Sequence, residues 1–91
     1  MDIYSQAVAE IIKQQQLVIG PLALDQARKV NGLSVADIDH LVISGNAKEV
    51  LVHLVQQYSQ IFGQASVEVC KEALKHLKSP PSRDDLPEIL R

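Results

Sequence analysis

Residues 7–30 read AVAEIIKQQQLVIGPLALDQARKV, and residues 50–73 read VLVHLVQQYSQIFGQASVEVCKEA. In each segment an apolar stripe with helical spacing leads to an apolar pair, a glycine and a second amphipathic stripe. Apolar residues that recur at i, i+3, i+4 and i+7 are typical of a helix with one buried face. Each segment therefore predicts a helical hairpin that turns at its glycine, Gly20 in the first and Gly63 in the second.

The two segments are consistent with an internal repeat. Gln14 aligns with Gln57 and Gly20 with Gly63, but few other positions are identical. Any two helices that face a core share the same kind of stripe, so coincidental helical patterning explains the likeness equally well. Both interpretations predict the same local structure, and both stay open at this point.

Glycine, proline and asparagine residues set the expected bounds of the helices. Helices are predicted at about residues 2–17 and 21–31, because glycine suits the end of the first and Pro21 the first turn of the second. Asn46 is a favoured N-cap residue and starts a third helix that runs to Gly63. A fourth helix is expected at about residues 65–77.

Residues 33–45 change to a period typical of strands. Two short β-type runs, residues 33–35 and 41–43, flank a loop of four or five residues, which predicts a β-hairpin that ends near Gly45. The alternative is a helical turn over residues 35–41, capped by Ser34. The predicted fold is mainly α, or α+β at most: two helical hairpins joined by a short β-hairpin, in the order α-α-ββ-α-α.

The C-terminal part differs in composition from the rest. Residues 1–78 are predicted to form a single helical domain, and residues 79–91 a tail that begins with the linker-like sequence Ser-Pro-Pro-Ser. Leu86, Ile89 and Leu90 predict one short helical turn, which either docks on the domain or remains free as a docking peptide. A frayed tail is the alternative, since termini are often poorly ordered.

Composition narrows the class of protein. The 91 residues fit one domain with a modest core, and aromatic residues make up only 3%, so dimerisation would be a natural way to gain stability. A net charge of −2 gives no electrostatic reason to expect nucleic acid or an anionic membrane as partner. With one cysteine, no signal-like segment and no long apolar run, we expect a soluble, cytoplasmic protein.

No residue pattern predicts catalysis, a cofactor or a metal site. Cys70 lies on an inward stripe and is expected to be a buried thiol that behaves as a small hydrophobe. His40, His53 and His76 lie in different predicted elements, without the spacing of metal ligands or a nucleophile nearby. Asp37 and the aspartate two residues later fit a turn better than a calcium loop. The chain is therefore expected to be non-enzymatic.

A partner surface is predicted on the first and third helices and on the tail. Apolar area beyond what a small core can cover often marks a partner site, although ordinary core-edge packing would give the same pattern. The expected partner is a protein, either a second copy in a homodimer or a signalling protein. The residues predicted to interact are Ile3, Tyr4, Val52, Tyr58, Leu86, Ile89 and Leu90.

A nucleic-acid-binding winged helix is the alternative function. Arg28 and Lys29 lead a predicted helix into the predicted β-hairpin, which is the order of elements in a winged helix. Asp25 lies one turn earlier, however, and no basic stripe extends into the hairpin. The interaction module is therefore preferred.

One short motif resembles a known group of proteins. Residues 18–23, Val-Ile-Gly-Pro-Leu-Ala, resemble the "IGP-x-A" helical segment near the C-termini of some bacterial signalling proteins, including serine/threonine kinases and nucleotide cyclases. Residues 61–73, with the sequence Ser-Arg-Asp-Asp-Leu at 82–86 beyond, resemble the same segment but have Gln64 in place of the proline. The resemblance covers about half of the chain. It implies a regulatory or assembly role beside signalling domains and no catalytic residue.

Overall fold

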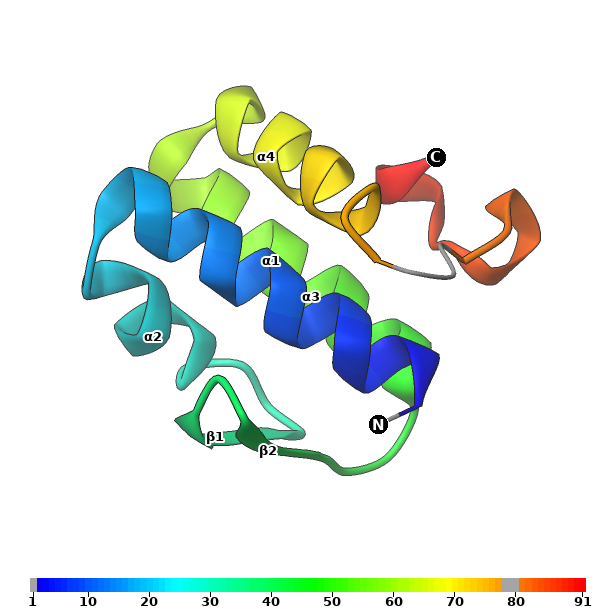
Figure 1. Ribbon diagram of the computed structural model, residues 1–91, viewed down its shortest axis with the longest axis horizontal. Coiled ribbons are helices and arrows are strands. Elements are labelled where there is room, and N and C mark those ends of the chain that lie inside the picture. The colour runs from blue at the N-terminus through cyan, green and yellow to red at the C-terminus, as the bar shows by residue number, and fades with distance from the viewer. Residues whose placement is uncertain (1, 78–80) are drawn as a thin grey trace.

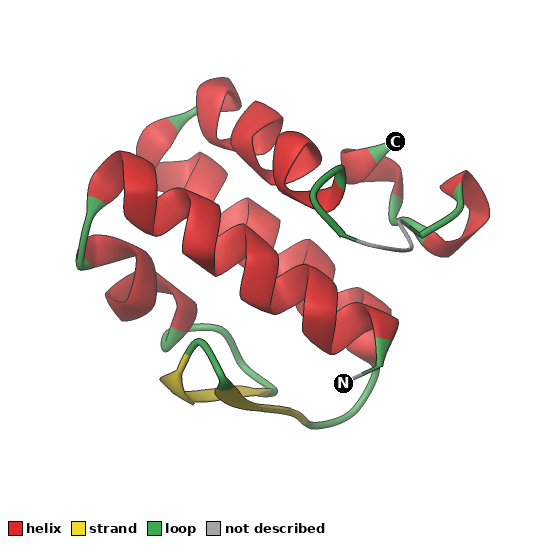
Figure 2. Ribbon diagram, in the orientation of Figure 1, coloured by secondary structure: helices red, strands yellow, loops and turns green. Residues whose placement is uncertain are grey.

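The computed structural model describes residues 2–77 and 81–91, which form a helical domain with one small β-hairpin (Figures 1 and 2). The order α-α-ββ-α-α is confirmed. In chain order the elements are α1 (Ile3–Ile19), α2 (Leu22–Ala27), β1 (Leu33–Asp37), β2 (His40–Ile43), α3 (Ala47–Phe62), α4 (Gln64–Leu74) and the 3-10 helices η1 (Arg83–Asp85) and η2 (Glu88–Leu90).

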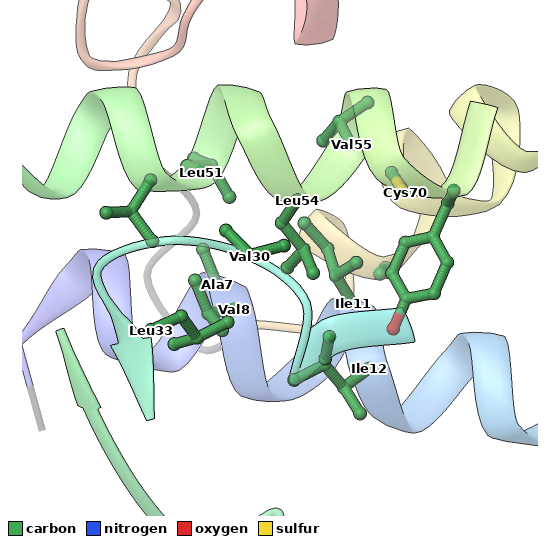
Figure 3. Close-up of a cluster of buried hydrophobic side chains, with 14 of the residues drawn as sticks. Ala7, Val8, Ile11, Ile12, Val30, Leu33, Leu51, Leu54, Val55 and Cys70 are labelled. Carbon is green, nitrogen blue, oxygen red and sulfur yellow. The ribbon is translucent and has the colours of Figure 1, made fainter. Parts of the chain in front are cut away.

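The core lies where α1 and α3 face each other. Figure 3 shows Ile11 of α1 and Leu54 of α3 pointing toward one another, with Cys70 of α4 nearby. Helix α1 also contacts α2 and α4, so it is the element around which the domain packs. The core is built almost entirely from aliphatic side chains, as the composition predicts. Fully or nearly fully buried are Ala7, Val8, Ile11, Ile12, Leu51, Leu54, Val55, Tyr58 and Cys70.

Both long helices begin with an acceptor side chain and end at a glycine. The Asp2 carboxylate accepts a hydrogen bond from the Ser5 amide at 2.8 Å, which lowers the pKa of Asp2, and the Asn46 side chain accepts one from the Glu49 amide at 3.0 Å. The predicted Asn46 cap is confirmed. At the other ends, Gly20 has φ 68° and ψ −145° and Gly63 has φ 75° and ψ −165°. Only glycine readily adopts this backbone conformation, so these residues permit the two sharp turns.

The second helix of each hairpin is shorter than predicted. Helix α2 ends at Ala27 rather than near residue 31, and α4 ends at Leu74 rather than near Leu77. The cause is the same in both cases. The chain continues in tighter i→i−3 turns, such as Val30 N–H to the Ala27 carbonyl at 3.1 Å and His76 N–H to the Ala73 carbonyl at 3.1 Å.

The predicted β-hairpin is confirmed, and the helical alternative for residues 35–41 is wrong. Its loop is shorter than expected, because Asp37 pairs directly with His40 and leaves only two residues in the turn. The register shifts between Val35 and Asp37, as in a β-bulge. Gly32 precedes the hairpin with φ 84°, and a Cβ there would lie 2.8 Å from the Ser44 carbonyl oxygen, so glycine is required at this close approach.

The C-terminal tail is docked on the domain. Leu90 is buried, Leu86 and Ile89 pack against the core, and η2 contacts α4. The Tyr4 hydroxyl donates a hydrogen bond to the Asp85 carbonyl at 3.0 Å, which ties the tail to the start of α1. Of the two predicted states, docked or free, the structure has the docked one, with two 3-10 helices instead of one turn. The predicted boundary at residue 78 and the start of the linker lie outside the described residues.

Candidate docking surface

The structure removes two residues from the predicted partner surface. Tyr58 is completely buried, and its hydroxyl donates a 2.7 Å hydrogen bond to the Ala23 carbonyl of α2. Leu90, in η2 of the tail, is also buried, and η2 contacts α4. Neither side chain reaches the surface of the folded chain. Tyr58 follows Leu54 and Val55 on the inward stripe of α3, and helical spacing places it inside despite its polar tip.

The other predicted residues are half-buried. Tyr4, Leu86 and Ile89 pack against the core. The hydrogen bond from the Tyr4 hydroxyl to the Asp85 carbonyl shows that α1 and the tail contact each other, so each covers part of the other's surface. Ile3 and Val52 keep a partly exposed surface. A role for these five residues in binding a partner stays a prediction.

A different region exposes large apolar side chains. Leu17 is 75% exposed, Val18 64%, Leu22 49% and Ile61 49%. The first two lie in the last turn of α1, Leu22 begins α2, and Ile61 lies in the last turn of α3. Figure 1 shows that the α1–α2 turn and the α3–α4 turn lie at the same end of the molecule. We call this region, Leu17, Val18, Leu22 and Ile61 with the two glycine turns, the apolar end.

The two chain segments that form the apolar end carry no charged side chain. Residues 14–24 and 54–67, which include both glycine turns, hold no Asp, Glu, Lys, Arg or His. The exposed polar residues there are amides, such as Gln60 and Gln64. Depletion of charge is characteristic of the central part of protein interfaces. The two uncharged runs are the sequence signal that could have identified this region. It is easily missed, because Leu17 and Val18 fall outside the core-facing stripe of their helix.

A hollow of about 200 Å³ opens at the apolar end. It lies between the last turn of α1 and the α3–α4 turn, and Gln15 joins these two elements at its base. The Gln15 side-chain amide donates to the Ser66 carbonyl at 3.0 Å and to the Cys70 sulfur at 3.5 Å. The lining residues are Gln15, Val18, Ile19, Phe62, Ala65, Ser66 and Val69.

Cys70 is buried, as predicted, and its environment does not favour a nucleophile. Burial raises the pKa of the thiol to about 11, so the sulfur is protonated at neutral pH. Burial also raises the pKa of Tyr58 well above its usual range. Both groups therefore act as neutral parts of the core.

Several of the polar residues that the sequence singled out serve the β-hairpin. The Asp37 carboxylate accepts a hydrogen bond from the Asp39 amide at 2.8 Å and lies 2.9 Å from Nδ1 of His40, which confirms the predicted turn chemistry. The hydrogen bond between the His40 and Asp37 side chains raises the pKa of His40 and lowers that of Asp37. Arg28 donates to the carbonyls of Val35 and Ala36, so its guanidinium is engaged in holding β1. In residues 2–77 and 81–91 no group of three or more His, Cys, Asp or Glu side chains is arranged to hold a metal ion.

Comparison of the chain with known protein families, with curated proteins and with solved structures finds no match. The resemblance to the segments of bacterial signalling proteins therefore stays a prediction. Within the described part of the chain, no helix combines the length and the apolar character needed to cross a membrane.

Proposed function

We propose that this protein is a non-enzymatic interaction module that associates with a second copy of itself through the apolar end. The observation that carries the proposal is the presence at one end of the molecule (Figure 1) of four exposed large apolar side chains, Leu17, Val18, Leu22 and Ile61, on sequence segments without Asp, Glu, Lys, Arg or His. Removing such side chains from water is the main favourable term in most protein association. Exposed apolar groups of this kind mark interaction sites.

The absence of charge supports a second copy as the partner. In a twofold-symmetric dimer the same patch lies on both subunits, so every charge near the axis would approach an identical charge. The uncharged residues 14–24 and 54–67 allow the apolar ends to meet without this repulsion. The exposed amide of Gln60 offers both donors and an acceptor, which suits a self-complementary rim. Gln64 is also exposed, and its Nε2 donates to the Glu68 carboxylate at 3.3 Å.

The size of the apolar end determines how strong the association is expected to be. Four exposed side chains form a small interface, which is typical of transient rather than permanent association. A weak contact suits a module that assembles when its local concentration rises. The segment that carries the resemblance to signalling proteins, residues 18–23, contributes Val18 and Leu22 to this same end. We therefore extend the proposal to a regulatory or assembly role beside signalling domains in the cytoplasm.

Sedimentation equilibrium over a hundredfold concentration range tests the proposal. The wild-type chain is expected to shift from monomer toward dimer with concentration. Leu17→Asp and Ile61→Asp should each keep the chain monomeric, because they place like charges at the twofold contact. Val42→Asp is the matched control, since Val42 is 62% exposed on β2 and outside the apolar end.

Two results contradict the proposal. A wild-type chain that stays monomeric over the whole range excludes self-association. A dimer that both aspartate variants leave intact, but that Val42→Asp disrupts, places the interface on the β-hairpin instead.

A further inference from the structure

The hollow at the apolar end has apolar walls and one polar group at its base. Val18, Ile19, Phe62 and Val69 supply the walls, and Gln15 lies beneath them. Gln15 is only 1% exposed, yet it is one of the residues that line the hollow. A side chain so deeply placed is held rigidly, here by its bonds to the Ser66 carbonyl and the Cys70 sulfur.

The hydrogen bonds of Gln15 are incomplete in one respect. Both of its bonds use the Nε2 donor, and no described residue donates to its Oε1. In the described part of the chain every fully buried side-chain oxygen has a partner, so Oε1 must reach the accessible surface. Gln15 is 1% exposed and lines the hollow, so this small surface of Oε1 is assigned to the base of the hollow. The base of an otherwise apolar site thus presents a fixed hydrogen-bond acceptor.

We propose that the hollow binds a small, mostly apolar molecule that carries one hydrogen-bond donor, such as a phenol. The apolar part would contact Val18, Phe62 and Val69, and the donor would bond to Oε1 of Gln15. An apolar cavity of about 150 Å³ is known to accept one benzene ring, so about 200 Å³ has room for a ring with one substituent. An acceptor at the base of an apolar site selects for a donor, since it loses its hydrogen bond to water when the site fills.

This inference goes beyond the proposed self-association and does not depend on it. The hollow is complete within one chain, because all of its lining residues come from α1, α3 and α4 and their connections. A monomer can therefore bind the ligand. If the apolar ends do meet, the ligand would be enclosed between the two copies or would compete with the contact, which the same titration detects as a change in the oligomeric state.

Phenol and anisole form the test pair. The two molecules share the aromatic ring, but the methylated oxygen of anisole cannot donate a hydrogen bond. In ¹⁵N-HSQC titrations at low protein concentration, phenol should give saturable shifts at Val18, Phe62 and Val69, with a dissociation constant of about 1 mM for a ligand of this size. Anisole should bind about fivefold more weakly, the factor that one neutral hydrogen bond contributes.

Two variants locate the site. Ala65 is exposed and lines the hollow, so Ala65→Leu should fill it without disturbing the core and should abolish phenol binding. Ala36→Leu, on the exposed face of β1, is the matched control and should bind phenol normally.

Three results overturn the inference. Linear shifts without saturation, or shifts spread over the whole chain, mean that no site exists. Binding that Ala65→Leu leaves unchanged places the site elsewhere. Equal affinity for phenol and anisole removes Gln15 as the selecting group, and this comparison needs only the wild-type chain.

Discussion

The two helical hairpins of this protein start alike and end differently. Helices α1 and α3 each begin with a side-chain cap and end at a glycine with φ near +70°, whose amide donates to the carbonyl four residues earlier. After this turn α2 has six residues and α4 has eleven. The local sequence therefore sets the turn, whereas packing beyond the turn decides how far the next helix continues.

The two short helices are held in different ways. Helix α4 buries an apolar stripe of its own, including Val67 and Cys70, against α1 and α3. Helix α2 buries Ala23, Gln26 and Ala27 and is fastened by polar groups of α3. Tyr58 donates to the Ala23 carbonyl at 2.7 Å, and the Gln57 side chain donates to Gln26 at 2.7 Å. Helix α2 is therefore held largely by hydrogen bonds from α3, whereas α4 is held mainly by apolar packing against α1 and α3.

The largest expected effect comes from Tyr58. Tyr58→Ala should lower the free energy of unfolding by about 3–5 kcal/mol, because it removes a buried ring and leaves a cavity. Tyr58→Phe keeps the ring and should cost about 1–2 kcal/mol through the lost hydrogen bond to Ala23. Urea denaturation measures both values.

Amide hydrogen exchange on Tyr58→Phe then tests whether α2 and α4 are held separately. Protection should fall in α2 and persist in α4, because the lost bond fastens α2 alone. Cys70→Ala is the reciprocal variant and should loosen α4 first. Equal loss of protection in both helices after Tyr58→Phe would show that the two hairpins unfold as one unit and that α2 and α4 are not held separately.

The next largest effect comes from the paired glycines. Gly20→Ala and Gly63→Ala should each cost about 1–3 kcal/mol, because an alanine is strained at these backbone angles. A Cβ would meet no atom within 4 Å at either position, so no steric clash adds to the backbone strain. The two substitutions should therefore lower the free energy of unfolding by nearly equal amounts. Thermal and urea unfolding provide the measurement.

Asparagine is the informative control at the same positions. It tolerates the ordinary left-handed helical region, but ψ near −145° and −165° lies outside that region. Gly63→Asn should therefore be as costly as Gly63→Ala. A clear difference between Gly20→Ala and Gly63→Ala would mean that the two turns are not equivalent, despite their matching angles.

The smallest effect concerns the β-hairpin that separates the two helical hairpins. The hydrogen bond with Asp37 raises the pKa of the exposed His40 above the usual value of 6.5. The stabilisation of the folded chain by the bond between His40 and Asp37 is therefore fully present below pH about 6.5. It is lost as the pH rises through the raised pKa of His40. An NMR titration of His40 should show this raised pKa, and Asp37→Asn should return it toward the usual value. An unchanged pKa in Asp37→Asn would exclude the bond in solution.

The sequence was most informative where structure depends on near neighbours. The Asn46 cap, the glycine turns and the inward position of Cys70 all follow from local spacing. The partner of Tyr58 is a carbonyl 35 residues away, and no local pattern announces such a bond. The apolar end was missed for a related reason. It combines the ends of α1 and α3, which only the packed structure brings together.

The position of the apolar end also has a geometric consequence. Helix α1 begins, and η2 ends, on the side of the molecule away from the two glycine turns (Figure 1). If two copies join through their apolar ends, their chain ends project in opposite directions. A cargo attached at either end of each copy would then be held at the far sides of the pair. Such a dimer would act as a spacer that links two cargoes while keeping them out of contact.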